Sequence, residues 1–250
     1  MSAGTRPRWV TFDCFGTLVD WQAGFAAMLA PFAGDSQLDL VRAYHASERL
    51  VEREQPHRSY KDVLATALMR AADQCGARIS DVDARTLARS WGSMRLFDDV
   101  ERMLAELRQK GCRLAVLTNC DDDLFELTHR GFRHPFDLFL TAERVRGYKP
   151  APWHFRAFER VTRVRRSDWV HVACSWYHDI APAQALGIKR VWFDRERTGE
   201  DPSSASFHVH TAADVVGAIQ ALFESQNDAR SPGPESGIGS QEVSSRRAGA

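Results

Sequence analysis

The sequence has no excess of charge of either sign. Its 250 residues include 33 Lys and Arg and 33 Asp and Glu, so the formal net charge is zero. Proteins that bind nucleic acid or anionic membranes usually carry a basic surface. We therefore expect neither nucleic acid nor a membrane as a partner. With 44% hydrophobic residues, a chain of this length can bury a substantial core.

The sequence also lacks paired cysteines and a long apolar segment. Its five cysteines, at positions 14, 75, 112, 120 and 174, show neither the spacing of a zinc site nor a C-x-x-C motif. The first nine residues, MSAGTRPRW, lack the apolar core of a signal peptide. The uncharged run 23–34 is too short to span a bilayer and contains Pro31. These absences predict free thiols and a cytoplasmic location.

An apolar, β-prone segment near the start ends abruptly at Asp13, and a short loop with Gly16 and Thr17 follows. Gly16 lets the backbone turn close to whatever Asp13 contacts. In open α/β sheets the chemistry lies at the carboxyl ends of the strands, where a carboxylate can act as a covalent nucleophile. Taken alone, Asp13 could also be an ordinary turn or helix-capping residue.

A run of predicted helices follows this first strand. Apolar residues recur at helical spacing over 38–55 and 60–75, and a third helix is expected over 82–91. In the first of these helices, Arg42, His45 and Arg49 share one face. That face is either solvated or directed at Asp13. Helices between two strands of a parallel sheet predict an inserted, all-helical cap, which we place at residues 21–94.

Strands and helices alternate in the rest of the chain. The predicted strands are 113–117, 136–140, 169–174 and 190–193. The first predicted helix begins with Asp98 as its N-cap and has Glu101 at the third helical position. The other predicted helices are 121–130, 152–161, a short helix that ends at 186, and 213–223. This alternation predicts an α/β fold with a doubly wound, Rossmann-like parallel sheet, built from residues 1–20 and 95–224. Residues 225–250 are rich in Ser, Gly, Pro and charge, which predicts a disordered tail.

Polar side chains stand after four of the predicted strands. They are Asp13 with Thr17, Thr118 with Asn119, Lys149, and Ser175 with Asp179. Each group also has an ordinary explanation, as a turn, a surface loop or, for Asp179, a helix cap. Because parallel strands end at the same edge of a sheet, we expect these side chains to meet at one site.

The order and spacing of these motifs resemble the haloacid dehalogenase-like superfamily. The resemblance covers about residues 8–220. It rests on Phe12–Leu18 with Asp20-Trp21, on Leu117–Asn119, on Tyr148–Pro150, and on His171–Ala173 with His178-Asp179. The first motif resembles the type II branch, which includes the L-2-haloacid dehalogenases. The resemblance implies a Rossmann-like core with a helical cap inserted after the first strand, and it allows a homodimer formed through cap or core helices.

Two departures from the phosphatases of this superfamily favour a dehalogenase. Phosphatases carry an acid two residues after the nucleophile, which protonates the leaving alkoxide. Phe15 occupies that position here and has no proton to give, whereas a halide needs none. Phosphatases also hold Mg²⁺ with further acids in the last motif. In that motif this chain has only Asp179. We therefore expect no required metal or other cofactor.

The resemblance implies a two-step hydrolysis of a short (S)-2-haloacid. Asp13 attacks the α-carbon and expels halide, and water then attacks the Asp13 carboxyl carbon and releases the 2-hydroxy acid. Lys149 would keep Asp13 ionised and oriented, because a nearby cation lowers the pKa of a carboxyl group by about 1–3 units. Thr17 would brace the loop after Asp13. Asp179, together with Ser175, would position the water or remove its proton.

The substrate-binding residues implied by the resemblance come from both parts of the chain. Thr118 and the backbone near Asn119 would bind the carboxylate of a small carboxylic acid, and Asn119 and Phe15 would also contact this substrate. A cap cation would receive the departing halide, for which Arg42 matches the family position best and Arg49 is the second candidate.

Three positions differ from the usual dehalogenase pattern. They are Thr118, Phe155 and Trp176, which stand where the dehalogenases have Ser, Tyr and Asn. His178, beside Asp179, either helps to hold the water or packs. These changes affect the substrate more than the nucleophilic step, so Asp13 could open another small acid, for example a strained cyclic amino acid. The alternatives are a Mg²⁺-dependent phosphatase of the same fold and a non-catalytic protein that binds a partner through its cap.

Overall fold

A six-stranded parallel sheet forms the centre of the fold. The structure is a computed structural model and describes residues 7–33 and 37–228. The strands are β1 (Arg8–Phe12), β2 (Cys112–Thr118), β3 (Leu138–Thr141), β4 (Trp169–Ala173), β5 (Lys189–Phe193) and β6 (Phe207–Val209). Their order is β3-β2-β1-β4-β5-β6, and every neighbouring pair is parallel. The predicted doubly wound, Rossmann-like fold is therefore confirmed.

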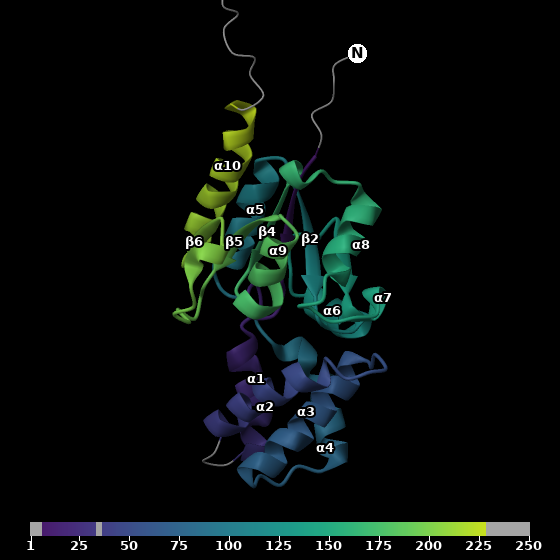
Figure 1. The fold of residues 1–250 in the computed structure, drawn as a ribbon. Coiled ribbons are helices and arrows are strands. Elements are labelled where there is room, and N and C mark those ends of the chain that lie inside the picture. The colour runs from purple at the N-terminus through teal and green to yellow at the C-terminus, as the bar shows by residue number, and fades with distance from the viewer. Residues whose placement is uncertain (1–6, 34–36, 229–250) are drawn as a thin grey trace, which may run out of the picture.

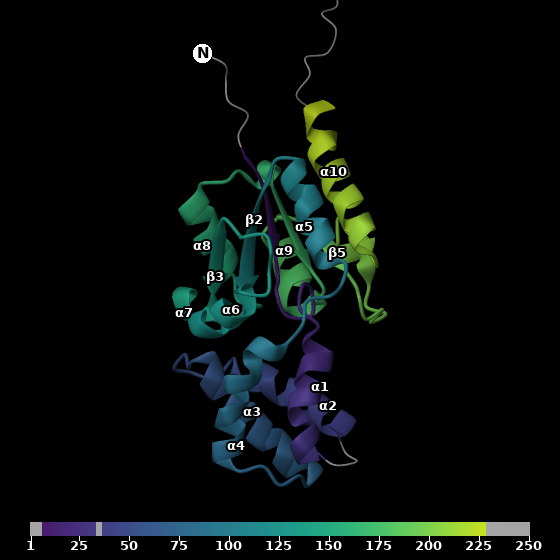
Figure 2. The same ribbon diagram turned by 180° about the vertical axis from the view of Figure 1, so that it is seen from behind.

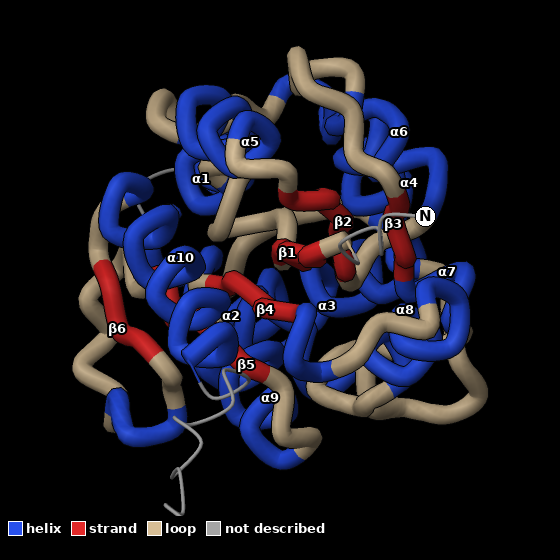
Figure 3. Tube along the Cα trace, turned by 90° about the horizontal axis from the view of Figure 1, so that it is seen from above, coloured by secondary structure: helices blue, strands red, loops and turns tan. Residues whose placement is uncertain are grey.

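Helices cover both faces of the sheet, as the views from two sides and from above show (Figures 1–3). One face carries α5 (Val100–Gln109) and α10 (Ala212–Asp228), and the other carries α8 (Trp153–Thr162) and α9 (Ala181–Ala185). The side chains of strand β1 are buried on both faces of the sheet. Val10 and Phe12 join one buried cluster, whereas Trp9 joins the other and packs edge-on against Phe158. Strands buried on both faces read as continuous apolar runs.

The helices of the predicted cap form a separate group beyond the carboxyl ends of the strands (Figure 1). They are α1 (Trp21–Ala33), α2 (Gln37–Val51), α3 (Tyr60–Cys75), α4 (Asp81–Thr86) and the 3₁₀ helix η2 (Leu87–Ser93). The chain enters and leaves this group along two adjacent segments. Asp20 donates its N–H to the carbonyl of Arg95, and Phe97 donates to that of Leu18. This double connection supports an inserted cap at residues 21–94.

The remaining elements are short. They are α6 (Asp122–His129), α7 (Ala142–Val145), η3 (Arg166–Asp168), the π-helical turn η4 (Trp176–Ile180) and η5 (Pro202–Ser204). Within the described part of the chain, no helix combines the length and the hydropathy needed to cross a bilayer.

Several predicted boundaries differ from the structure. Helix α5 has Asp99 rather than Asp98 as its N-cap, and the Glu101 carboxylate accepts the N–H of Arg133 instead of closing a capping box. The helix predicted over 82–91 is α4 followed by the separate 3₁₀ helix η2. Helix α10 includes residues 225–228, which the composition assigned to the tail. The rest of that predicted tail, residues 229–250, lies outside the described residues.

Candidate active site

Asp13 extends β1 by one residue and faces the end of the sheet. Its N–H still donates to the carbonyl of Val172 on β4 (3.0 Å). The loop then turns at Gly16, whose φ is +89°, and a Cβ there would lie 2.8 Å from the Cys174 sulfur. The Thr17 hydroxyl donates to Asp13 Oδ2 (2.8 Å) and accepts the N–H of Cys174 (2.9 Å). Thr17 therefore braces the Asp13 loop against the end of β4.

Lys149 lies in the middle of the site and is buried. Its ammonium donates to Asp13 Oδ1 (2.8 Å), to Asp179 Oδ1 (2.7 Å) and to the carbonyl of Leu117 (2.9 Å). These three bonds use all of its protons. Burial alone would lower the pKa of Lys149, but the two carboxylates outweigh it and raise this pKa. Burial would likewise raise the pKa of Asp179, but Lys149 and His171 lower it to about 2.

Asn119 positions the Lys149 segment. Its side chain accepts the N–H of Lys149 (2.8 Å) and donates both to the carbonyl of Lys149 and to Glu52 Oε1 of the cap (3.0 Å each). The neighbouring Thr118 is fully buried, and its hydroxyl points to the sulfur of Cys120 (3.6 Å). Of these two predicted substrate contacts, the structure therefore brings only Asn119 to the pocket wall.

A chain of buried hydrogen bonds lies behind Asp179. Its Oδ1 contacts His171 Nε2 (3.0 Å), His171 Nδ1 contacts the Thr11 hydroxyl (2.9 Å), and that hydroxyl accepts the indole N–H of Trp169 (2.8 Å). Because the indole can only donate, the Thr11 hydroxyl is free to donate to Nδ1. His171 then donates its Nε2 proton to Asp179. The partners of Asp179 Oδ1 are thus the side chains of Lys149 and His171, whereas a helix-capping carboxylate accepts backbone N–H groups.

Ser175 pairs with His178 rather than with Asp179. The Ser175 hydroxyl accepts the backbone N–H of His178 (3.1 Å) and lies 3.1 Å from its Nδ1. On the other side, His178 Nε2 lies 3.5 Å from Glu52 Oε2 of the cap. Burial would lower the pKa of His178, but the Glu52 carboxylate outweighs it and raises this pKa. His178 therefore joins cap and core electrostatically.

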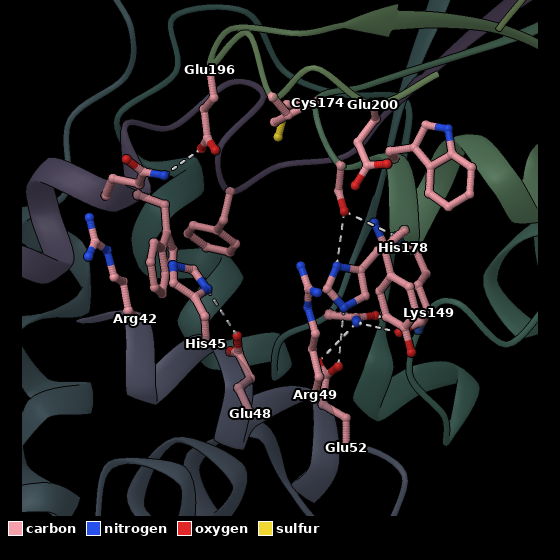
Figure 4. A pocket seen from close by; sticks show the side chains of 18 of the residues that line it. Arg42, His45, Glu48, Arg49, Glu52, Lys149, Cys174, His178, Glu196 and Glu200 are labelled. Carbon is pink, nitrogen blue, oxygen red and sulfur yellow. Dashed lines mark hydrogen bonds and ion pairs between the residues drawn. The ribbon is translucent and has the colours of Figure 1, made fainter. Parts of the chain in front are cut away.

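A cavity of about 510 Å³ opens between the cap and the core (Figure 4). The core contributes Phe15, Lys149 and residues 174–178 to its wall, and the cap contributes side chains of α1 and α2. Both predicted cap cations, Arg42 and Arg49, line it. Arg42 is 81% exposed and lies 4.0 Å from Asp39, whereas the Arg49 guanidinium stacks over the Tyr177 ring.

Two cap carboxylates also line this cavity, that of Glu48 in α2 and that of Glu52 directly after the end of this helix (Figure 4). Glu48 accepts the hydroxyls of Tyr44 (2.9 Å) and Tyr60 (2.6 Å). Burial, followed by the charge of Glu52, raises the pKa of Glu48 to about 7. Burial is also the main reason that the pKa of His45 falls to about 4. From the sequence, only the basic residues Arg42, His45 and Arg49 were predicted for this side of the cavity. Glu48 and Glu52 were missed, although they follow the same helical spacing.

We expect Glu48→Gln to remove a pH-dependent loss of stability. The pKa of Glu48 is about 7 in the folded state against 4.5 without the fold. The folded chain therefore binds the extra proton, and its free energy of unfolding falls as the pH rises through this window. At about 1.4 kcal/mol per unit, the loss reaches about 3 kcal/mol. Glutamine still accepts both tyrosine hydroxyls.

Urea denaturation at pH 5 and pH 8 measures this effect. Wild type should lose about 2–3 kcal/mol more than Glu48→Gln between the two pH values. Glu106→Gln, on the surface beside Lys110, is the matched control and should behave as wild type. An equal pH dependence in wild type and Glu48→Gln would contradict this assignment.

Comparison with known proteins agrees with the fold and with the motifs. The model of a family described as haloacid dehalogenase-like hydrolase matches residues 12–193. The chain belongs to this family. The resemblance noted from the motifs is therefore confirmed, and with it the assignment to a family of hydrolases.

Individual relatives include both dehalogenases and phosphatases. Haloacetate dehalogenase H-2 of Moraxella sp. (strain B) is 24% identical over 74% of this chain and 85% of its own length. The phosphoserine phosphatase of Thermus thermophilus is 34% identical, but over only 49% of this chain and 51% of its own. A solved L-2-haloacid dehalogenase superimposes with a TM-score of 0.77 at 23% identity, covering 86% of this chain and all of that one. The reaction must therefore be argued from the site.

Proposed function

We propose that this hydrolase releases halide from a short 2-haloacid. The Asp13 carboxylate attacks the α-carbon from the side opposite the halide, and the carbon–halogen bond breaks as the ester bond forms. Lys149 orients the nucleophile through Asp13 Oδ1, and Thr17 holds the other oxygen. The match to haloacetate dehalogenase H-2, which covers 85% of that protein's length, supports this proposal.

Phe15 is the observation that carries the proposal. It lines the cavity two residues after Asp13, and its ring packs against Trp91 with centroids 5.0 Å apart. A phenyl ring has no proton to give, so this position cannot assist an alkoxide leaving group. A halide leaves without protonation and is compatible with it.

Asp179 is placed to handle the water of the second step. Its Oδ2 is buried and has no hydrogen-bond partner among the residues that the structure describes, and the same holds for Trp176 Nε1 in the same turn. Buried polar atoms without partners are usually satisfied by a bound polar molecule. We propose that the attacking water binds at Asp179 Oδ2. This water loses a proton to Asp179 as it attacks the carboxyl carbon of the Asp13 ester. The bond between the Asp13 carboxyl carbon and the substrate oxygen then breaks, and this oxygen takes the proton of the added hydroxyl. The products are the 2-hydroxy acid and the free Asp13 carboxylate, and Asp179 gives its proton to solvent.

The carboxylates of the site do not fit Mg²⁺. This ion takes about six oxygen ligands in octahedral geometry. Here the facing oxygens of Asp13 and Asp179 both bind the Lys149 ammonium, and the second oxygen of Asp13 binds Thr17. The ammonium already supplies the positive charge between the two acids. We therefore propose a reaction without a required metal.

We expect Arg42→Gln to raise the KM for a 2-haloacid by about tenfold or more, because an ionic hydrogen bond contributes about 1.5–3 kcal/mol. The parallel variant Arg49→Gln removes the other arginine of the cavity wall. Steady-state kinetics of both variants measure the effect. An unchanged KM in Arg42→Gln with a raised KM in Arg49→Gln would transfer the role to Arg49.

Halide release from a panel of short 2-haloacids, with and without a chelator, tests the proposed function. Turnover that is unaffected by the chelator is the expected result. Turnover of an aryl phosphate that depends on added Mg²⁺, without halide release, would instead identify a phosphatase, as the Thermus relative suggests. A non-catalytic protein would show neither activity.

A further inference from the structure

Two histidines and an aspartate gather at the edge of the sheet, outside the catalytic site. Asp194 directly follows β5, His208 lies in β6, and His210 follows β6. The parallel register pairs Phe193 with Val209, so Asp194 and His210 come next in the same register. One metal-binding atom from each of the three side chains lies within 4.8 Å of the others. Across residues 7–33 and 37–228, no other group of three His, Cys, Asp or Glu side chains meets this condition.

Hydrogen bonds and ring stacking orient each of these three side chains so that it can bind a metal ion. His210 Nδ1 lies 2.9 Å from the backbone oxygen of Asp194. A carbonyl oxygen only accepts, so Nδ1 carries the proton and Nε2 of the neutral ring keeps its lone pair. Histidines that bind metals usually donate their second N–H in this way. Asp194 Oδ1 accepts the N–H of Thr198 (3.1 Å), which orients the carboxylate, and the His208 ring stacks on Trp192.

The closest contact in the group matches the geometry of zinc. His208 Nε2 lies 3.1 Å from Asp194 Oδ2. Two ligand atoms about 2.0–2.1 Å from a tetrahedral zinc ion are about 3.3 Å apart. An ion can therefore replace the proton between them with little movement. Two imidazoles and one carboxylate suit zinc and similar transition metals, whereas Mg²⁺ prefers oxygen ligands alone.

We propose that Asp194, His208 and His210 bind one divalent transition-metal ion of the zinc type, with water as a further ligand. Asp194 is only 2% exposed, and a buried carboxylate is stabilised by such a charge. The segment after Asp194 reaches the catalytic cavity, because Glu196 and Thr198 line its wall. The ion therefore fixes the start of a segment that shapes the cavity, but the site does not depend on the proposed reaction.

Titration of the full chain with ZnCl₂, after removal of metals with a chelator, tests this site by calorimetry. We expect one ion per chain, with the affinity at least about tenfold lower in His208→Gln and in His210→Gln. Zinc should also raise the melting temperature of wild type, and this shift should be absent in the double variant His208→Gln/His210→Gln.

Two controls separate this site from other binding. His134→Gln changes a histidine that also pairs with a carboxylate, that of Glu101 (2.8 Å), but belongs to no three-residue group in the described chain. Asp13→Asn removes a carboxylate of the catalytic site. Both variants should bind zinc as wild type does. The proposal is overturned if zinc does not bind saturably, if the folded double variant keeps wild-type affinity, or if Asp13→Asn alone abolishes binding.

Discussion

Replacing Asp13 with asparagine is expected to lower halide release by at least about 10⁴-fold, because the variant has no nucleophile. The structure indicates that the fold survives. The asparagine carbonyl can accept from Lys149 as Asp13 Oδ1 does (2.8 Å), and its amide can donate to the Thr17 hydroxyl, which now lies 2.8 Å from Oδ2. Halide release at saturating substrate, with circular dichroism to verify folding, measures the loss.

Asp20→Asn is the matched control, because it makes the same chemical change in the segment that leads into the cap. Asp20 Oδ1 accepts the backbone N–H of Ala23 (3.1 Å), and the loss of the negative charge of Asp20 should leave turnover near that of wild type. A single turnover in ¹⁸O-water adds a direct test, since oxygen from water must enter the Asp13 carboxylate when the ester is hydrolysed. Asp13→Asn with substantial activity, or an unlabelled Asp13, would refute the covalent step.

The meeting of Asp13, Lys149 and Asp179 could be predicted from the sequence for a topological reason. Each follows an apolar strand or its loop, and parallel strands deliver such residues to the same edge of the sheet. The structure joins the three through one ammonium, with contacts of 2.7 and 2.8 Å. The direction of individual side chains was not predictable in this way. Thr118 lies at the carboxyl end of β2, where it is the last residue of the strand, but its hydroxyl turns toward Cys120.

The cap side of the cavity was harder to predict, because a helix face does not reveal what it packs against. The spacing in α2 placed Arg42, His45 and Arg49 together, but Glu48 and Glu52 enter the same cavity. Only the tertiary contacts explain them, through the tyrosines around Glu48 and through Asn119 and His178 around Glu52. Strand β6 was missed for a different reason, since its three residues, Phe207–Val209, are too few for an alternating apolar pattern to identify a strand.

Lys149→Met is expected to destabilise the fold as well as abolish turnover. Lys149 is 1% exposed and is the ammonium shared by two carboxylates, of which Asp179 is fully buried. Removing one partner of a buried ion pair costs about 3–5 kcal/mol, because the remaining charge has no partner. Without Lys149, burial dominates and the pKa of Asp179 should rise from its value of about 2. The variant should therefore lose more stability at pH 8 than at pH 5, where Asp179 can take up a proton.

Urea denaturation at the two pH values measures this loss, and two further variants make it specific. Lys61→Met removes a lysine that also contacts two carboxylates, Asp121 and Asp123, but is 42% exposed, so it should cost less than about 1 kcal/mol. Adding Asp179→Asn to Lys149→Met removes the unpaired charge and should restore part of the stability at pH 8. Equal losses in the Lys61 and Lys149 variants, or a double variant no more stable than Lys149→Met, would show that the ammonium is not what stabilises the two acids.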